Sequence, residues 1–114
     1  MPMVTVLYDV NQGATESHID EIMEVLPAII AEALSAPGIS LVPTDVTVVD
    51  MAPTRRSKNF PRLEVQVEMN GPQGRNPEEV HARIKELIAA TNILPKNFLD
   101  GLVWLRCEDN SVYG

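Results

Sequence analysis

The sequence predicts a two-layer α+β domain with the element order β-α-β-β-α-β, in which two helices cover one face of a four-stranded sheet. Three observations support this class. Two amphipathic stretches alternate with short β-branched segments, each half of the chain has the order strand, helix, strand, and turn residues separate the segments. The 114 residues have the length of one domain and no linker divides them, so residues 1–114 are expected to fold together.

The first half of the chain predicts a strand, a long helix and a second strand. Residues 3–8 are mostly β-branched and apolar, which is typical of a strand. Apolar residues then recur every three or four positions over 17–36, the spacing of an amphipathic helix with Ser17 as its cap. Pro27 falls inside this helix and predicts either a kink or a restart. Residues 46–51 alternate as the second strand.

The second half repeats this order after a basic loop at 53–59. Apolar and polar residues alternate over 62–69, which indicates a third strand with one face on the core. Asn76 suits the N-cap of a second helix and Pro77 suits its first position. Residues 102–107 form an apolar fourth strand, and a polar tail is expected after it.

Charge and composition exclude several classes of protein. The formal net charge of -7 argues against nucleic-acid binding, which depends on Lys and Arg neutralising phosphates. Cys107 is the only cysteine, so no intrachain disulfide is expected and a reducing, cytoplasmic location is predicted. The first residues do not form a signal peptide, and no stretch reaches the ~20 apolar residues that span a bilayer, so no membrane partner is expected.

Pro2 is a candidate catalytic residue, because removal of Met1 would leave its secondary amine at the start of the first strand. Burial disfavours the ammonium form of an amine, and nearby arginines do the same, so the pKa of such an amine falls toward neutrality. The free amine can then remove a proton from the carbon next to a carbonyl group. Many unrelated chains also begin with Met-Pro, and in those the proline has no chemical role.

The chain resembles the tautomerase superfamily, in particular its longer members such as macrophage migration inhibitory factor and 5-carboxymethyl-2-hydroxymuconate isomerase. The resemblance lies in the opening Met1-Pro2-Met3, in the element order, in the Asn70-Gly71 turn, and in Leu94-Pro95 followed by Val103-Trp104-Leu105-Arg106. In layout it covers nearly the whole chain. The same element order also occurs in ferredoxin-like sandwiches, which are small binding and regulatory modules.

The resemblance implies a homotrimer in which a neighbouring subunit completes the pocket of each copy. Pro2 would act there as general base and acid, without a cofactor, in the keto-enol or double-bond isomerisation of a small substrate that carries a carboxylate. Trp104 is similar to the family's pocket aromatic, Arg106 to the polar residue two positions further along the strand, and Asn70 to a residue beside the proline. The lysine that follows the first helix in the inhibitory factor has no counterpart in 35–39.

Two groups of arginines are candidates for binding the substrate carboxylate. Arg55 and Arg56 lie with Lys58 in the basic loop, and a guanidinium can form a bidentate pair with a carboxylate, although a solvated loop is the preferred interpretation. Arg106 is the better candidate, because it lies on a strand among apolar residues and needs an anionic partner there. That partner is either the substrate or a glutamate of the third strand in a structural ion pair.

The histidines and the cysteine indicate no metal site. His18 and His81 have no third ligand at metal spacing. Cys107 is expected to be a buried structural residue, since alternate strand residues point to opposite faces.

A second hypothesis for the function belongs to another class. The chain would be a non-catalytic, oligomeric interaction module of ferredoxin-like or tautomerase-like fold. Pro2 would then be incidental, and the sheet would bind copies of the chain or a protein partner.

Overall fold

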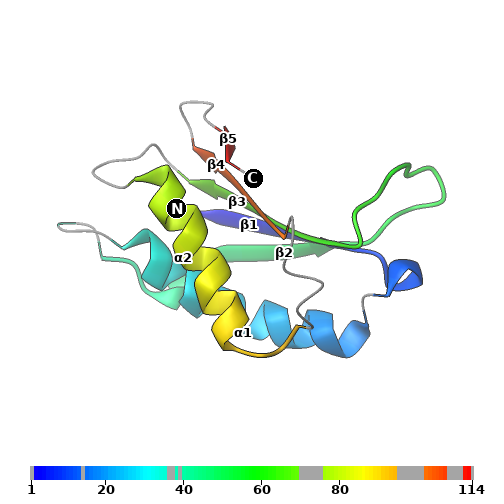
Figure 1. Cartoon of the computed structure of the whole chain (residues 1–114), viewed down its shortest axis with the longest axis horizontal. Helices are drawn as coiled ribbons and strands as arrows, with labels where there is room; N and C mark the ends of the chain where they lie inside the picture. Colours follow the sequence, from blue (N-terminus) through cyan, green and yellow to red (C-terminus); the bar gives the residue numbers. More distant parts are fainter. Residues whose placement is uncertain are drawn as a thin grey trace.

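The computed structural model describes residues 2–13, 15–35, 38, 40–69, 76–94, 102–107 and 112–113. Figure 1 shows one mixed sheet with the two helices on the same side of it. In chain order the elements are β1 (Met3–Tyr8), the short 3-10 helix η1 (Val10–Gln12), α1 (Glu16–Leu34), the short 3-10 helix η2 (Pro43–Asp45), β2 (Thr47–Met51), β3 (Leu63–Met69), α2 (Pro77–Ala90), β4 (Val103–Cys107) and β5 (Val112–Tyr113).

The sheet is built from two βαβ units joined side by side, as the sequence predicts. Its strand order is β2-β1-β3-β4-β5. β1 runs parallel to β2, and β3 runs parallel to β4, with a helix between the members of each pair. The antiparallel pair of β1 and β3 joins the two units at the centre of the sheet. The predicted α+β class and its β-α-β-β-α-β order are confirmed.

A short fifth strand extends the predicted four-stranded sheet. The polar tail expected after the fourth strand contains Val112–Tyr113, which pair antiparallel with Arg106 and Leu105 of β4. The outer edge of β4 would otherwise expose unpaired backbone N–H and C=O groups, and two residues of ladder cover part of that edge.

The cap residue of α1 differs from the predicted one, whereas the cap residue of α2 is the predicted one. Thr15, and not Ser17, caps α1, because the Thr15 side chain accepts the backbone N–H of His18 at 3.2 Å. The helix is continuous through Pro27, so the predicted restart is wrong. Asn76 caps α2 by accepting the N–H groups of Glu78 and Glu79 at 2.9 and 3.3 Å. In the described part of the chain, no helix is long and apolar enough to cross a membrane.

The core lies between the sheet and the two helices. Val4, Val6, Val65 and Val67 of the central strands are completely buried. The helices contribute their apolar stripes from the other side: Ile22, Leu26, Ile30, Leu34, Ile84 and Ile88. Both described helices therefore cover the same face of the sheet, and neither lies on the other face (Figure 1).

Candidate functional site

Pro2 is buried at the point where the chain enters β1. Its carbonyl oxygen accepts the backbone N–H of Thr47 at 3.2 Å, which extends the parallel β1–β2 pairing by one step. Successive side chains of a strand point to opposite faces, so Pro2 shares the helix-covered side with Val4 and Val6. The side chain of Pro2 is therefore shielded from water at the start of the sheet.

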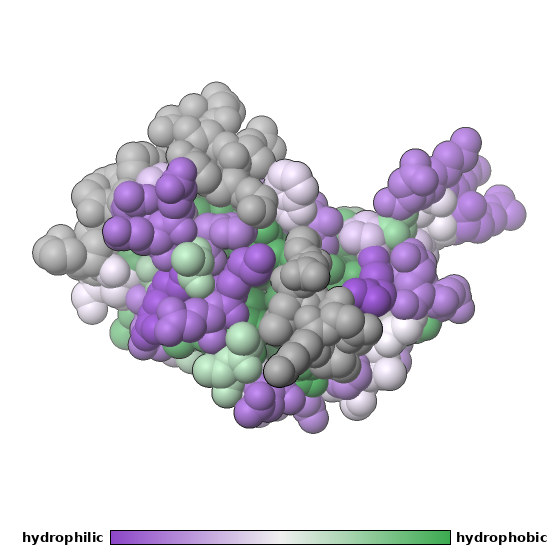
Figure 2. All heavy atoms as spheres, viewed as in Figure 1, coloured by the Kyte–Doolittle hydropathy of each residue, from purple (hydrophilic) through white to green (hydrophobic). Residues whose placement is uncertain are grey.

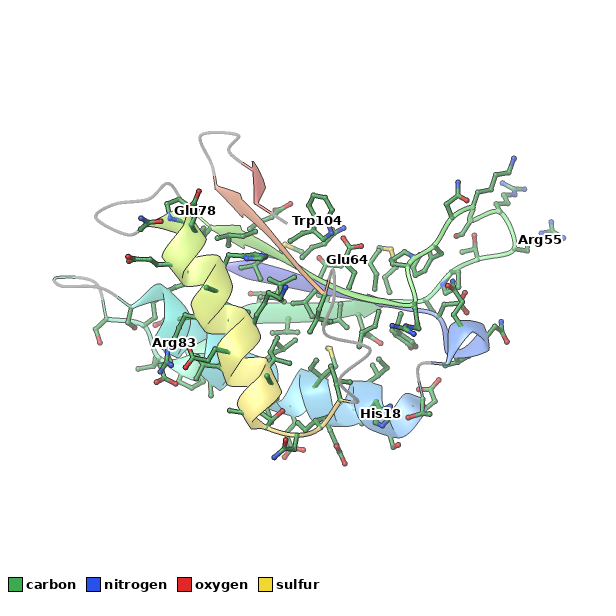
Figure 3. All side chains as sticks on the ribbon, viewed as in Figure 1. His18, Arg55, Glu64, Glu78, Arg83 and Trp104 are labelled. Atoms are coloured by element: carbon green, nitrogen blue, oxygen red, sulfur yellow. The ribbon has the colours of Figure 1, made fainter. Side chains whose placement is uncertain are left out.

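The opposite face of the sheet, called the open face below, carries a mixed row of side chains. In the register, Thr5 of β1 lies opposite Val49 on one side and Gln66 on the other, and Gln66 lies opposite Trp104. Figure 3 shows Trp104 and Glu64 pointing away from α1. Four large apolar residues of this face, 38% to 52% exposed, are Met3, Val49, Met51 and Trp104. These residues remove apolar area from water if the open face contacts another molecule.

The backbone of Arg106 lies on the strand and the face that the sequence predicts. It is two residues from Trp104 on β4, and its register partner is Glu68 of β3, which in turn lies opposite Met3. A carboxylate and a guanidinium in adjacent register positions are near enough for an ion pair. Asn70, the third residue taken from the resemblance, lies outside the described residues.

Pro2 and Trp104 do not meet within one chain. Pro2 is on the helix-covered side of the sheet, whereas Trp104 is on the open face and two strands away, across β3. A pocket that contains both residues therefore needs a second copy of the chain.

Arg55 and Arg56 lie at the end of the sheet opposite to Pro2. Leu7 pairs with Met51 just before their loop begins, and β1 spans six residues, or roughly 17 Å from its first to its last residue. Both arginines are exposed, and Figure 3 shows Arg55 pointing away from the body of the molecule. One chain does not bring them to Pro2.

Tyr8, at the end of β1, is a polar group in the core that sequence reasoning treats only as a strand residue. Its hydroxyl donates a long hydrogen bond of 3.5 Å to Oδ2 of Asp50. Burial raises the pKa of Tyr8, and so do the negative charges of Glu16, Asp50 and Asp20 and the hydrogen bond to Asp50. Tyr8 is therefore a neutral hydrogen-bond donor at physiological pH. The sequence could have indicated this position, because strand alternation places Tyr8 on the same face as the buried Val4 and Val6.

The two histidines have no arrangement that suggests a metal. Within the described ranges, no group of three or more His, Cys, Asp or Glu side chains is placed to hold an ion. His81 of α2 lies with Nε2 2.8 Å from the carbonyl oxygen of Val103, so it links the helix to β4.

Comparisons with known proteins identify similar folds at low sequence identity. No protein-family model and no curated protein matches the sequence. A malonate semialdehyde decarboxylase structure is 11% identical with a TM-score of 0.58, over 93% of this chain and 84% of that one. A member of the cis-3-chloroacrylic acid dehalogenase family is 14% identical with a TM-score of 0.56, over 98% and 80%. A fused 4-OT described as a symmetric trimer is 15% identical with a TM-score of 0.50, over 92% and 84%.

Proposed function

We propose, from the premise that this chain has the fold of the tautomerase superfamily, that it is an enzyme of that superfamily. Its reaction would be the tautomerisation or isomerisation of a small keto or enol acid without a cofactor. The observation that carries the proposal is the burial of Pro2 directly before β1. The known structures of this fold include a decarboxylase and a dehalogenase-family member, so the fold alone does not select the reaction.

The amine of Pro2 is the proposed base and acid. Once Met1 is removed, the secondary amine in its buried position is held mainly in the neutral form, because burial penalises the ammonium. It would take a proton from the carbon next to the substrate carbonyl, and the electron pair of the broken C–H bond would form the enolate. The resulting ammonium would return the proton to another atom of the same enolate. The atoms and charges balance, and the product is an isomer of the substrate.

The proposed site lies between copies in a homotrimer. Pro2 and Trp104 occupy opposite faces of one sheet, so Trp104 and Arg106 would have to reach the Pro2 of a neighbouring copy. The exposed apolar residues of the open face support association, because burying them against a second copy removes them from water.

Arg106 is the proposed partner of the substrate carboxylate. Its position two residues from Trp104 on the open face supports this role, since the aromatic ring can pack against the substrate while the guanidinium pairs with the carboxylate. Asn70 is proposed beside Pro2 from the resemblance alone. Arg55 and Arg56 are the second choice, because they are at the far end of β1 from the proline of their own chain.

The state of the amino terminus tests the proposal. Intact mass of the natural protein would establish whether Met1 is removed. Processed and Met1-retaining forms would then be compared for tautomerisation of phenylenolpyruvate, with circular dichroism as a control for folding. The processed form is expected to be active and the Met1-retaining form inactive. Equal rates from both forms would exclude Pro2 as the base.

A non-catalytic oligomeric module is the second candidate. The four exposed apolar residues of the open face favour it, because burying them against a second copy does not depend on a free amine at Pro2. A processed protein that assembles but turns over no keto or enol acid would favour this candidate.

A further inference from the structure

A basic arm projects from the end of the sheet, and the proposed reaction does not use it when Arg106 binds the substrate carboxylate. It comprises residues 53–59, which connect β2 to β3. It contains Arg55, Arg56 and Lys58 and no carboxylate. Figure 1 shows this connection reaching away from the sheet, and Figure 2 shows its hydrophilic surface standing clear of the rest of the molecule.

Hydrogen bonds hold the arm in one shape. Two hydrogen bonds close its turn. The backbone N–H of Ser57 donates to the carbonyl oxygen of Thr54 at 3.0 Å, and the backbone N–H of Thr54 donates to the hydroxyl oxygen of Ser57 at 3.0 Å. At its base, the side-chain amide of Gln12 donates to the carbonyl of Phe60 at 2.7 Å. A preorganised arm loses less conformational entropy when it binds a partner than a flexible one does.

Among the described residues, no ion pair involves the three cations of the arm. Arg83 forms ion pairs with Glu32 at 3.1 Å and with Glu86 at 3.5 Å. Arg55, Arg56 and Lys58 are all exposed and take part in neither. Three adjacent positive side chains on a protein with a net charge of -7 are therefore available to an acidic partner.

The first half of α1 is an acidic surface of matching character. Its exposed carboxylates are Glu16, Asp20, Glu21 and Glu24. The whole of α1 contains no Lys or Arg, and Glu32, which pairs with Arg83, lies in its second half. Four negative side chains within about two and a half turns attract a cationic segment.

We propose that the basic arm of one copy docks on the acidic first half of α1 in a second copy. Figure 3 shows Arg55 directed away from the body of its own chain and from His18, near the start of α1, so the arm is not placed to bind the α1 of its own chain. The contact joins two different surfaces, so three copies can close it into a ring. Nucleic acid fits less well, because the remainder of the chain is strongly acidic and repels phosphates. This proposal does not depend on the proline chemistry.

A pair of charge reversals with matched controls tests the arm. Arg56→Glu is expected to raise the dissociation constant of the assembly by about tenfold, measured by analytical ultracentrifugation at low salt, because an attractive exposed pair becomes a repulsive one. Lys85→Glu makes the same change of charge on α2 and is expected to leave assembly unchanged. Added salt should reduce the difference between Arg56→Glu and wild type.

The acidic surface is tested in the same way. Glu21→Lys should weaken assembly about as much as Arg56→Glu, whereas Glu79→Lys on α2 should not. Combining Arg56→Glu with Glu21→Lys should restore most of the affinity, since the pair is then reversed but attractive. Circular dichroism checks that each variant is folded.

Two outcomes would overturn the proposal. If Arg56→Glu assembles with the wild-type dissociation constant, the arm does not dock. If Arg56→Glu weakens assembly and no charge reversal on α1 restores the affinity, the arm does not dock on α1. Trypsin gives an independent measure, because cleavage after Arg55, Arg56 or Lys58 should be slower at protein concentrations that favour assembly. Cleavage at a rate independent of protein concentration would also contradict docking. All these measurements are independent of turnover, so they separate this proposal from the proposed enzymatic activity.

Discussion

Glu68 lies directly opposite Arg106 in the parallel pair of β3 and β4. The same glutamate lies opposite Met3 in the antiparallel pair with β1, so one carboxylate stands between the start of β1 and the arginine on β4. Arg106 thus has two possible anionic partners: Glu68 of its own chain and the carboxylate of a substrate. The two roles predict different results when either residue is changed.

Arg106→Ala is expected to weaken binding of small keto acids. If Arg106 pairs with a substrate carboxylate away from water, the loss should reach roughly 2–5 kcal/mol, because the carboxylate is left without its partner. Isothermal titration calorimetry would measure it. Glu68→Gln is the control, since it removes the neighbouring charge and keeps Arg106. Unchanged affinity together with a lower Tm in Arg106→Ala would instead assign this arginine to a structural ion pair.

Pro2→Ala is expected to keep the fold and slow the reaction. The change leaves a primary amine in the same place after Met1 removal, so the rate should fall by roughly the 10²–10⁴-fold contribution of a general base. The wild-type rate should rise with pH as the buried amine loses its proton, at a pKa below that of an exposed proline amine. Initial rates of phenylenolpyruvate tautomerisation across pH would measure both effects. A variant as fast as processed wild type would contradict the proline mechanism.

Tyr8→Phe is expected to change stability in alkaline solution. The folded pKa of Tyr8 is raised above its ordinary value of 10.0, chiefly by burial. Folding is therefore favoured by the neutral phenol below pH 10.0, and this contribution is lost as pH rises from 10.0 through the higher folded pKa. Thermal unfolding at several alkaline pH values should show a steeper loss of Tm in wild type than in Tyr8→Phe. Parallel curves would mean that Tyr8 does not contribute to the pH dependence.

Val49→Asp is expected to weaken self-association through the open face. Light scattering at micromolar concentration should give a trimer for wild type and smaller species for the variant, because a carboxylate then occupies an apolar contact. Val42→Asp is the matched control, since Val42 is also exposed, at 51%, but lies before η2 and outside the sheet. Equal dissociation of both variants would argue against the open face as the contact, and a monomeric wild type would exclude the trimer.

Patterns that repeat along the chain predicted most of the fold. The alternation over 62–69 predicted β3 because successive side chains of a strand point to opposite faces. The odd-numbered residues of β3 are the buried ones. The Asn76-Pro77 start of α2 was predictable because a side-chain oxygen must satisfy free N–H groups there. The two residues of β5 are too few to show a period, and they form a strand only because the edge of β4 is beside them.

The candidate site was less predictable than the fold. Alternation could place Trp104 and Arg106 on one face, but it could not show that Pro2 belongs to the other side of the sheet. That relationship depends on how the strands pair across the two halves of the chain. The separation of Arg55 from Pro2 likewise depends on the register of β1 with β2.

The contact between His81 and Val103 has a consequence for the way sheets of this protein can join. The N–H of Val65 donates a hydrogen bond to the carbonyl oxygen of Leu102. The carbonyl of the next residue, Val103, therefore points away from β3 toward the outer edge, where it lies 2.8 Å from Nε2 of His81. With β5 paired to Leu105 and Arg106, part of the β4 edge is already occupied, which leaves fewer of its backbone groups for an incoming strand. Open-ended strand-by-strand growth into fibres needs a free border on both sides of each molecule. An imidazole on one carbonyl thus helps to protect the folded chain from polymerising.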